Sequence, residues 1–184
     1  IFVEMSDLKE STISTAVVYK GDFLDVRRDE VLLPNGETGT REWINHPGAV
    51  VIVPILPDGE IALIKQFRYA AGSEFIELPA GKLDSGEDPE ECALRELEEE
   101  IGYRANKIKF LANIHPAIGF TNEIMGVFLA ENLEKTEHNR DKDEFLELVP
   151  TTLTEAVNLV WENKITDVKS IIGLLWLEKI RIIS

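Results

Sequence analysis

Several features are scarce or absent in this chain of 184 residues, and each absence excludes a class of protein. Cys92 is the single cysteine, so neither an internal disulfide nor a four-cysteine zinc site can form. The longest apolar runs, residues 49–56 and 171–177, are far shorter than the roughly 20 residues that a membrane-spanning helix needs. No signal-peptide pattern is present either. We therefore expect a cytoplasmic protein without a membrane partner.

Positive charge is also in short supply. The chain has 19 lysines and arginines against 34 aspartates and glutamates, which gives a formal net charge of −15. This balance works against general binding to nucleic acid, because the phosphate backbone attracts basic surfaces. An anionic small molecule can still bind where metal ions screen its charge. We therefore expect a small-molecule partner and no nucleic-acid partner.

The composition that remains is that of a folded protein, with 44% hydrophobic and 29% charged residues. Residues 13–45 alternate in polarity, and Asn35-Gly36 is a strong hairpin signal. We take residues 5–45 as a β-rich N-terminal section and residues 46–184 as the main domain.

The main domain mixes short strands with helices. Residues 48–56 and 61–68 are expected to pair as a hairpin around a turn at 57–60. The other expected strands are 74–79, 108–114, 124–130 and 145–149, and helices are expected at 152–163 and 167–181. Leucine and isoleucine at helical spacing assign Trp161 and Trp176 to the core. Together these elements predict an α+β fold or an α/β/α sandwich.

The best-signalled helix spans residues 89–101. Asp88 is its expected N-cap, Pro89 is its first residue, and Gly102 follows its end. On this helix Glu96, Glu99 and Glu100 share one arc beside the apolar stripe.

These three glutamates repel one another, and the helix dipole disfavours negative charge at this end. Most runs of acidic residues are simply solvated surface. Here the acids border the core and follow the glycine-containing loop 81–87, so the pattern favours a hard divalent cation bound by carboxylate oxygens.

The segment 81–103 resembles the Nudix box. Its fixed positions are Gly81, Glu87, the triplet Arg95-Glu96-Leu97, the pair Glu99-Glu100, and Gly102. The wider chain is most similar to the ADP-ribose pyrophosphatase branch, through its N-terminal β section, Pro79-Ala80-Gly81 and the Gly-Phe-Thr-x-Glu segment at 119–123. The resemblance implies a Nudix α/β/α sandwich with an extra N-terminal β section.

The same resemblance implies Mg²⁺-dependent hydrolysis of the pyrophosphate bond of a nucleoside diphosphate sugar, with Mn²⁺ as a substitute ion. ADP-ribose would give AMP and ribose 5-phosphate. The implied metal ligands are the Ala80 carbonyl and the carboxylates of Glu96, Glu99 and Glu100. Arg95 joins the catalytic set as the residue that orients these ligands, since it can pair with Glu99 one helical turn away.

The resemblance also implies residues for substrate and for proton transfer. Trp43 would stack on the base, Arg41 and Arg68 would bind phosphates, and Glu123 would contact substrate. Glu144, in an acidic loop, aligns best with the general base, while Asp143, Glu123 or Glu99 could serve instead. A homodimer is implied, with residues 13–45 contributing to the partner's site.

One departure from the branch leaves the substrate open. The branch often has Ser-Pro-Gly where this chain has Ala117-Ile118-Gly119. A broader or GDP-mannose-type hydrolase is therefore an alternative, and so is a Nudix enzyme for oxidised nucleoside triphosphates or capped RNA. A non-catalytic Nudix-fold ligand sensor is the alternative of another class, although such a sensor is expected to lose box carboxylates and none is missing here.

Overall fold

A computed structural model describes residues 8–136 and 145–183 of the chain. The chain divides into two units, one formed by Ile1–His46 with Ala117–Glu123 and the other by Pro47–Pro116 with Ile124–Ser184. Within the described residues, no helix is long and apolar enough to cross a bilayer.

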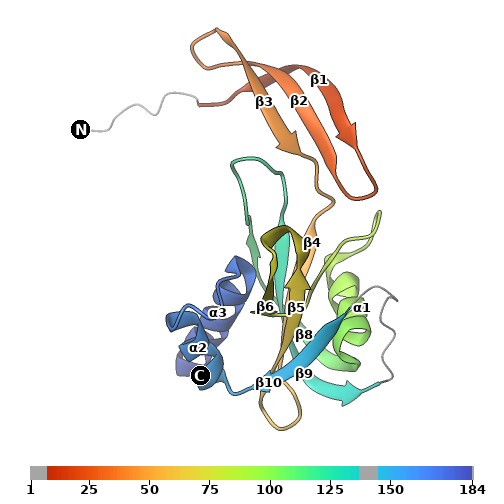
Figure 1. The fold of residues 1–184 in the computed structure, drawn as a ribbon, viewed down its shortest axis with the longest axis vertical. Coiled ribbons are helices and arrows are strands. Elements are labelled where there is room, and N and C mark those ends of the chain that lie inside the picture. Colours follow the sequence, from red (N-terminus) through yellow and green to blue (C-terminus); the bar gives the residue numbers. More distant parts are fainter. Residues whose placement is uncertain (1–7, 137–144, 184) are drawn as a thin grey trace, which may run out of the picture. The chain divides into compact units, whose positions relative to one another are not determined.

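The first unit is built on an antiparallel sheet in the order β1-β2-β3 (Figure 1). Its strands are β1 (Ser11–Lys20), β2 (Asp25–Leu32) and β3 (Thr38–Ile44). The predicted hairpin is confirmed between β2 and β3, where Gly36 has a φ of +84° and its N–H donates to the Leu33 carbonyl at 2.9 Å. The segment Ala117–Glu123 joins this unit through a bridge between Thr121 and Ile44.

The second unit contains two sheets. One has the order β7-β4-β9-β8, formed by β7 (Ala80–Lys82), β4 (Ala49–Pro54), β9 (Met125–Lys135) and β8 (Tyr103–Ile114). The other has the order β10-β5-β6, formed by β10 (Leu146–Thr151), β5 (Ile61–Arg68) and β6 (Ser73–Glu77). A short 3₁₀ turn, η1 (Tyr69–Ala71), links β5 to β6.

Helices cover both sides of these strands, α1 (Pro89–Ile101) on one side and α2 (Leu153–Trp161) with α3 (Val168–Ile183) on the other (Figure 1). Strand β4 is buried throughout and divides its side chains between two cores. Val51 and Val53 pack in the core that includes Leu174 of α3, whereas Val50 and Ile52 pack in the core of α1. This three-layer arrangement confirms the predicted α/β/α sandwich.

The predicted hairpin between β4 and β5 is wrong. The chain reverses at Gly59 as expected, with a φ of +90°, yet β4 pairs with β7 and β9, while β5 pairs with β6 and β10. One bridge, between Ile55 and Ile61, is the pairing recorded across this turn. Strands buried on both faces lack the polarity alternation that would indicate their partners.

The assignment of Trp161 and Trp176 to the core is also wrong, because 71% and 41% of their surfaces are exposed. The buried stripe of α3 runs instead through Ser170, Leu174 and Leu177. Trp161 is the last residue of α2, beyond its buried Ala156 and Val157. Helical spacing predicted the two helices, but it did not identify which of their residues are buried.

Candidate active site between the box helix and strand β7

Helix α1 begins and ends where its sequence signals place it. The Asp88 carboxylate accepts a hydrogen bond from the Glu90 N–H at 2.8 Å, and Gly102 follows the helix with a φ of +69°. Cys92, Ala93, Leu97 and Ile101 are buried in the core beneath the helix. This anchoring fixes which way the neighbouring glutamates point.

Two of these glutamates reach the backbone at the start of β7. The Glu100 side chain, 2% exposed, accepts a hydrogen bond from the Ala80 N–H at 3.1 Å. Glu96 lies so close to Gly81 that a Cβ added there would stand 1.8 Å from its carboxyl carbon. A Cβ at position 81 would therefore displace the Glu96 carboxylate from this place beside the backbone.

Arg95 donates hydrogen bonds to three carboxylates of the Nudix-box segment. Its guanidinium donates to Glu87 at 2.8 and 3.0 Å, to Glu96 at 2.7 Å and to Glu99 at 2.9 Å. These carboxylates raise the pKa of Arg95, and hydrogen bonds from Arg95 lower the pKa of Glu87 to about 2. Arg95 and Glu87 therefore carry charge at neutral pH, and the hydrogen bonds of Arg95 hold the Glu96 and Glu99 side chains in place.

The donor set at this site fits a hard divalent cation. Within the described ranges, no three Asp, Glu, His or Cys side chains converge closely enough to hold a metal by themselves. The contacts of Glu96 and Glu100 with residues 80–81 nevertheless bring carboxylate oxygens to the peptide of Ala80. Oxygen ligands from carboxylates and a backbone carbonyl are those that Mg²⁺ and Ca²⁺ prefer.

Arg68, at the end of β5, belongs to a second group of charges. Its Nε and Nη2 atoms donate to the two oxygens of Glu77 at 2.7 and 2.8 Å, and this bond raises the pKa of Arg68. Glu77 is 2% exposed and also accepts from Lys169, which is 6% exposed. Lys169 in turn donates to Asp167 at 2.7 Å.

The other expected substrate residues lie in the first unit. The Trp43 indole N–H donates to Asp29 at 2.9 Å, Arg41 pairs with Glu10, and a Glu123 oxygen lies 3.9 Å from the His46 ring nitrogen. Trp43 is half-buried, so it is neither a core residue nor a fully exposed one.

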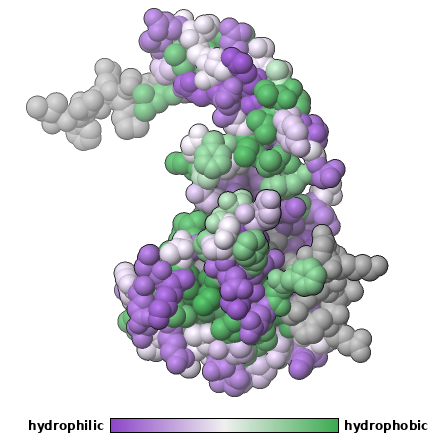
Figure 2. Space-filling view, viewed as in Figure 1, coloured by the Kyte–Doolittle hydropathy of each residue, from purple (hydrophilic) through white to green (hydrophobic). Residues whose placement is uncertain are grey.

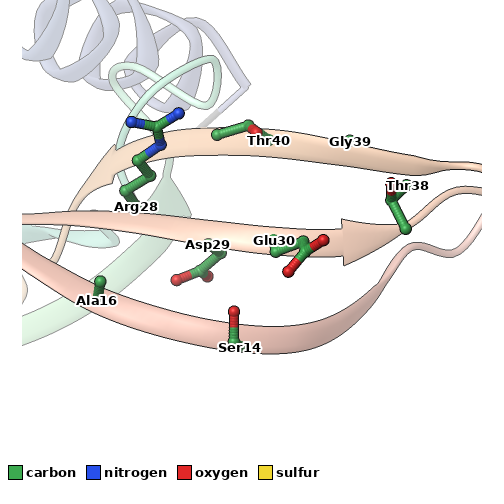
Figure 3. Close-up of a pocket in the computed structure, with 8 residues that line it drawn as sticks. All are labelled: Ser14, Ala16, Arg28, Asp29, Glu30, Thr38, Gly39 and Thr40. Atoms are coloured by element: carbon green, nitrogen blue, oxygen red, sulfur yellow. The ribbon is translucent and has the colours of Figure 1, made fainter.

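A pocket of about 340 Å³ lies on the N-terminal sheet (Figure 3). In Figure 3 the neighbouring side chains of Arg28 and Asp29 point to opposite sides of β2. Asp29 is 8% exposed, and its Oδ1 atom is buried without a hydrogen-bond partner among the residues that the structure describes.

Sequence reasoning missed Glu77, Lys169 and Asp29, and it placed the general base at Glu144, which lies outside the described residues. Two signals were available. Glu77 interrupts an apolar strand just before Leu78-Pro79, and Lys169 stands in the first turn of a helix, where the dipole disfavours a cation. A charge at such a position needs a partner.

Comparison with known proteins agrees with this geometry. The NUDIX domain matches residues 45–169, and the nucleoside diphosphate sugar hydrolase N-terminal domain matches residues 10–44. Among curated relatives, the ADP-ribose pyrophosphatase of Bacillus subtilis (strain 168) is 41% identical over 95% of both chains. The methanol dehydrogenase activator of Bacillus methanolicus is 39% identical over 92% of this chain and 93% of its own.

A solved structure titled as an ADP compounds hydrolase superposes with a TM-score of 0.83 and 25% identity, covering 93% of each chain. Nudix hydrolases generally use divalent metal ions, which the oxygen-rich donor set at Ala80, Glu96 and Glu100 fits. The box, the three-layer fold and these matches together show that the chain belongs to the Nudix hydrolase family.

Proposed function

We propose that this protein hydrolyses the pyrophosphate bond of nucleoside diphosphate sugars, with ADP-ribose as the preferred substrate and AMP and ribose 5-phosphate as products. The observation that carries the proposal is the approach of Glu96 and Glu100 to the backbone of residues 80–81. The N-terminal match to nucleoside diphosphate sugar hydrolases and the similarity to an ADP-ribose pyrophosphatase support this substrate class.

The residues that would hold the metal are Ala80, through its carbonyl, with Glu96, Glu99 and Glu100. Mg²⁺ is the proposed ion and Mn²⁺ a substitute. When bound, it would neutralise charge on the pyrophosphate and lower the pKa of water. In the reaction a water oxygen forms a bond to phosphorus, the bridging P–O bond breaks, and a carboxylate takes the water proton.

We assign that proton acceptor to Glu144, with Glu99 as the alternative. Glu144→Gln should lower kcat by about 10²- to 10⁴-fold, the usual cost of losing a general base, with little change in KM. A fall below tenfold, together with an inactive Glu99→Gln variant, would move the role to the helix.

The substrate class is tested by separating and measuring the nucleotide products formed from ADP-ribose, GDP-mannose, dinucleoside polyphosphates and nucleoside triphosphates with Mg²⁺. We expect the highest kcat/KM for ADP-ribose. Preference for GDP-mannose would keep the class and change the sugar. Absence of turnover on every compound, with binding retained, would instead support a ligand sensor.

We further propose that residues 5–45 serve dimerisation and substrate contacts, and that residues 46–184 carry catalysis. Every residue of β1 is exposed, including Ile13, Val17 and Val18, and Figure 2 shows apolar surface (green) on this unit. A second copy of the chain would cover such a surface.

Sedimentation at micromolar concentration should therefore give a dimer, and Val18→Asp should weaken it. Ile182→Asp, at an exposed position of α3, is the control. A fully active wild-type monomer would contradict the proposal. A cytoplasmic location remains a prediction from the lone Cys92, which is buried and unpaired with another cysteine.

A second candidate function is the activation of a dehydrogenase, because the relative at 39% identity is a methanol dehydrogenase activator. Its similarity is close to that of the ADP-ribose pyrophosphatase, so sequence alone does not separate the two. Adding the protein to a methanol dehydrogenase assay, with the Glu100→Gln variant beside it, tests this activity and its dependence on hydrolysis.

A further inference from the structure

We infer that Glu77, Lys169 and Asp167 are positioning residues that hold the Arg68 guanidinium for a phosphate of the substrate. The inference rests on the proposed function, since it takes Arg68 as a phosphate-binding residue. It assigns a role in substrate binding to the start of α3, a helix outside the Nudix box.

Arg68 and Glu77 form a bidentate ion pair, with two parallel hydrogen bonds. Glu77 accepts from Arg68 Nε at 2.7 Å and from Nη2 at 2.8 Å, so both groups are fixed in one plane. The pair uses two of the five N–H donors of the guanidinium and takes nothing from Nη1. Arg68 keeps 44% of its side chain exposed, whereas Glu77 keeps 3%, so the arginine presents its other edge to solvent.

Glu77 is held in turn from α3. Its Oε2 atom accepts from both Arg68 and Lys169, and Lys169 also donates to Asp167 at 2.7 Å. Asp167 accepts from the backbone N–H of Ser170 at 3.0 Å and from its hydroxyl at 2.6 Å. Buried charges of this kind are stable only when each has its partners, so the four side chains form one unit.

A second hydrogen bond joins the residue that follows β6 to the same helix. The Leu78 N–H, next in sequence after Glu77, donates to the Ser170 hydroxyl at 2.7 Å. Glu77, the last residue of β6, and Leu78, the residue after it, thus bind the consecutive residues Lys169 and Ser170 at the start of α3.

The residues that follow β6 lead directly to the proposed metal ligand Ala80 and its partner Glu100. The Pro79 carbonyl accepts from the Ile52 N–H at 2.9 Å, and the Ala80 N–H donates to Glu100 at 3.1 Å. The negative charge of Glu100 contributes to the raised pKa of Arg68, after the larger effect of its hydrogen bond to Glu77, so the two groups are close enough to interact. Residues 77–80 therefore connect the arginine to the carboxylate that would hold the metal.

A double-mutant cycle between Glu77→Gln and Arg68→Ala tests the inference, with the equilibrium binding of ADP measured by titration calorimetry. ADP carries the diphosphate and needs no turnover. Arg68→Ala should weaken ADP binding by about 10- to 100-fold, the range for a hydrogen bond to a charged group. Glu77→Gln should weaken it by about 10-fold, and by less than about threefold when Arg68 is already alanine.

Hydrolysis of the preferred substrate provides a second readout. We expect Glu77→Gln to raise KM by a similar factor and to change kcat by less than about threefold, because the contact to a substrate phosphate is made in the ground state as well. A loss confined to packing would not separate KM from kcat in this way. If Glu77→Gln does not fold, Glu77→Asp keeps the charge but shortens the side chain, and it should also raise KM.

The surface pair of Lys107 and Glu131, 2.5 Å apart between β8 and β9, gives the matched control cycle. Lys107→Ala and Glu131→Gln should leave ADP binding within twofold.

The outcomes separate the inference from the proposed function. Equal losses from Glu77→Gln in both backgrounds, or unchanged ADP binding in Arg68→Ala, would overturn the inference while leaving hydrolysis intact. A wild-type protein that hydrolyses no compound but shows the non-additive cycle would retain the inference and refute the function. A wild-type protein that does not bind ADP would overturn the inference.

Discussion

The two ionic networks of the second unit have the same chemistry and different surroundings. Arg95 binds Glu87, Glu96 and Glu99, all within eight residues along the chain, and 30% of its side chain is exposed. Glu77 and Lys169 are 92 residues apart in sequence, and their side chains are 3% and 8% exposed. The Arg95 network is local and partly exposed, whereas the Glu77–Lys169 pair joins distant parts of the chain and is buried.

This difference predicts what each network contributes. The more water reaches an ion pair, the less the pair adds to stability, down to about 0 to 1 kcal/mol at a fully exposed surface. Removing one partner from a buried pair leaves a charge that water cannot reach, which costs about 3 to 5 kcal/mol. The network of Arg95 should therefore matter mainly for activity, whereas the network of Glu77 should matter for both stability and substrate binding.

The largest effect is expected at Glu100, a proposed metal ligand on the same helix as the Arg95 network. Glu100→Gln keeps the shape of the side chain but removes a carboxylate oxygen from beside Ala80. We expect kcat to fall by about 10³-fold, as when one preorganised electrostatic group is lost from an active site. Steady-state kinetics with saturating Mg²⁺ measures the change. Glu91→Gln, in the exposed first turn of α1, is the control, and near-normal turnover of Glu100→Gln would remove this residue from the ligand set.

The second network is broken by Lys169→Met. Glu77 would then remain buried with Arg68 as its partner. We expect the free energy of unfolding to fall by about 3 kcal/mol, the lower end for a broken buried pair, because one cation is retained. Urea denaturation measures it. Lys164→Met removes a lysine that is 62% exposed and paired with Glu162, and it should cost less than about 0.5 kcal/mol. Equal losses in the two variants would show that burial does not distinguish these pairs.

The same contrast explains how far the sequence could predict the structure. Helix α1 was predicted with its correct bounds, because its caps and its glutamates are read from neighbouring positions. The Arg95–Glu99 pair followed from helical spacing for the same reason. The pairing partners of β4 and β5 and the Glu77–Lys169 contact depend on strands and helices meeting across the fold. No local sequence pattern specifies which distant segments come into contact. A charged residue inside an apolar segment, such as Glu77, indicates only that it has a partner.

A smaller effect is expected from Arg95→Lys. Lysine keeps the charge but lacks the planar fork that lets Arg95 bind Glu87 through two nitrogens while it holds Glu96 and Glu99. Residues that orient metal ligands typically affect activity by about 10- to 100-fold, and we expect kcat to fall within this range. Kinetics measured against Mg²⁺ concentration would show the loss. Arg104→Lys, at an exposed pair with Glu98, is the control, and a loss below twofold for Arg95→Lys would show that the fork is dispensable.

The smallest effect concerns the stability of the Arg95 network against acid. Hydrogen bonds from Arg95 lower the pKa of Glu87 from its ordinary 4.5 to about 2. A lowered pKa stabilises the folded state above the unfolded pKa, and this contribution is lost as the pH falls from about 4.5 to about 2. Because water screens the pair, we expect a contribution of about 1 kcal/mol or less. Melting temperatures of the wild type and of Glu87→Gln should therefore differ at pH 6 and converge towards pH 2.5. A difference that stays constant over this range would mean that Glu87 stabilises the fold by packing and not by its charge.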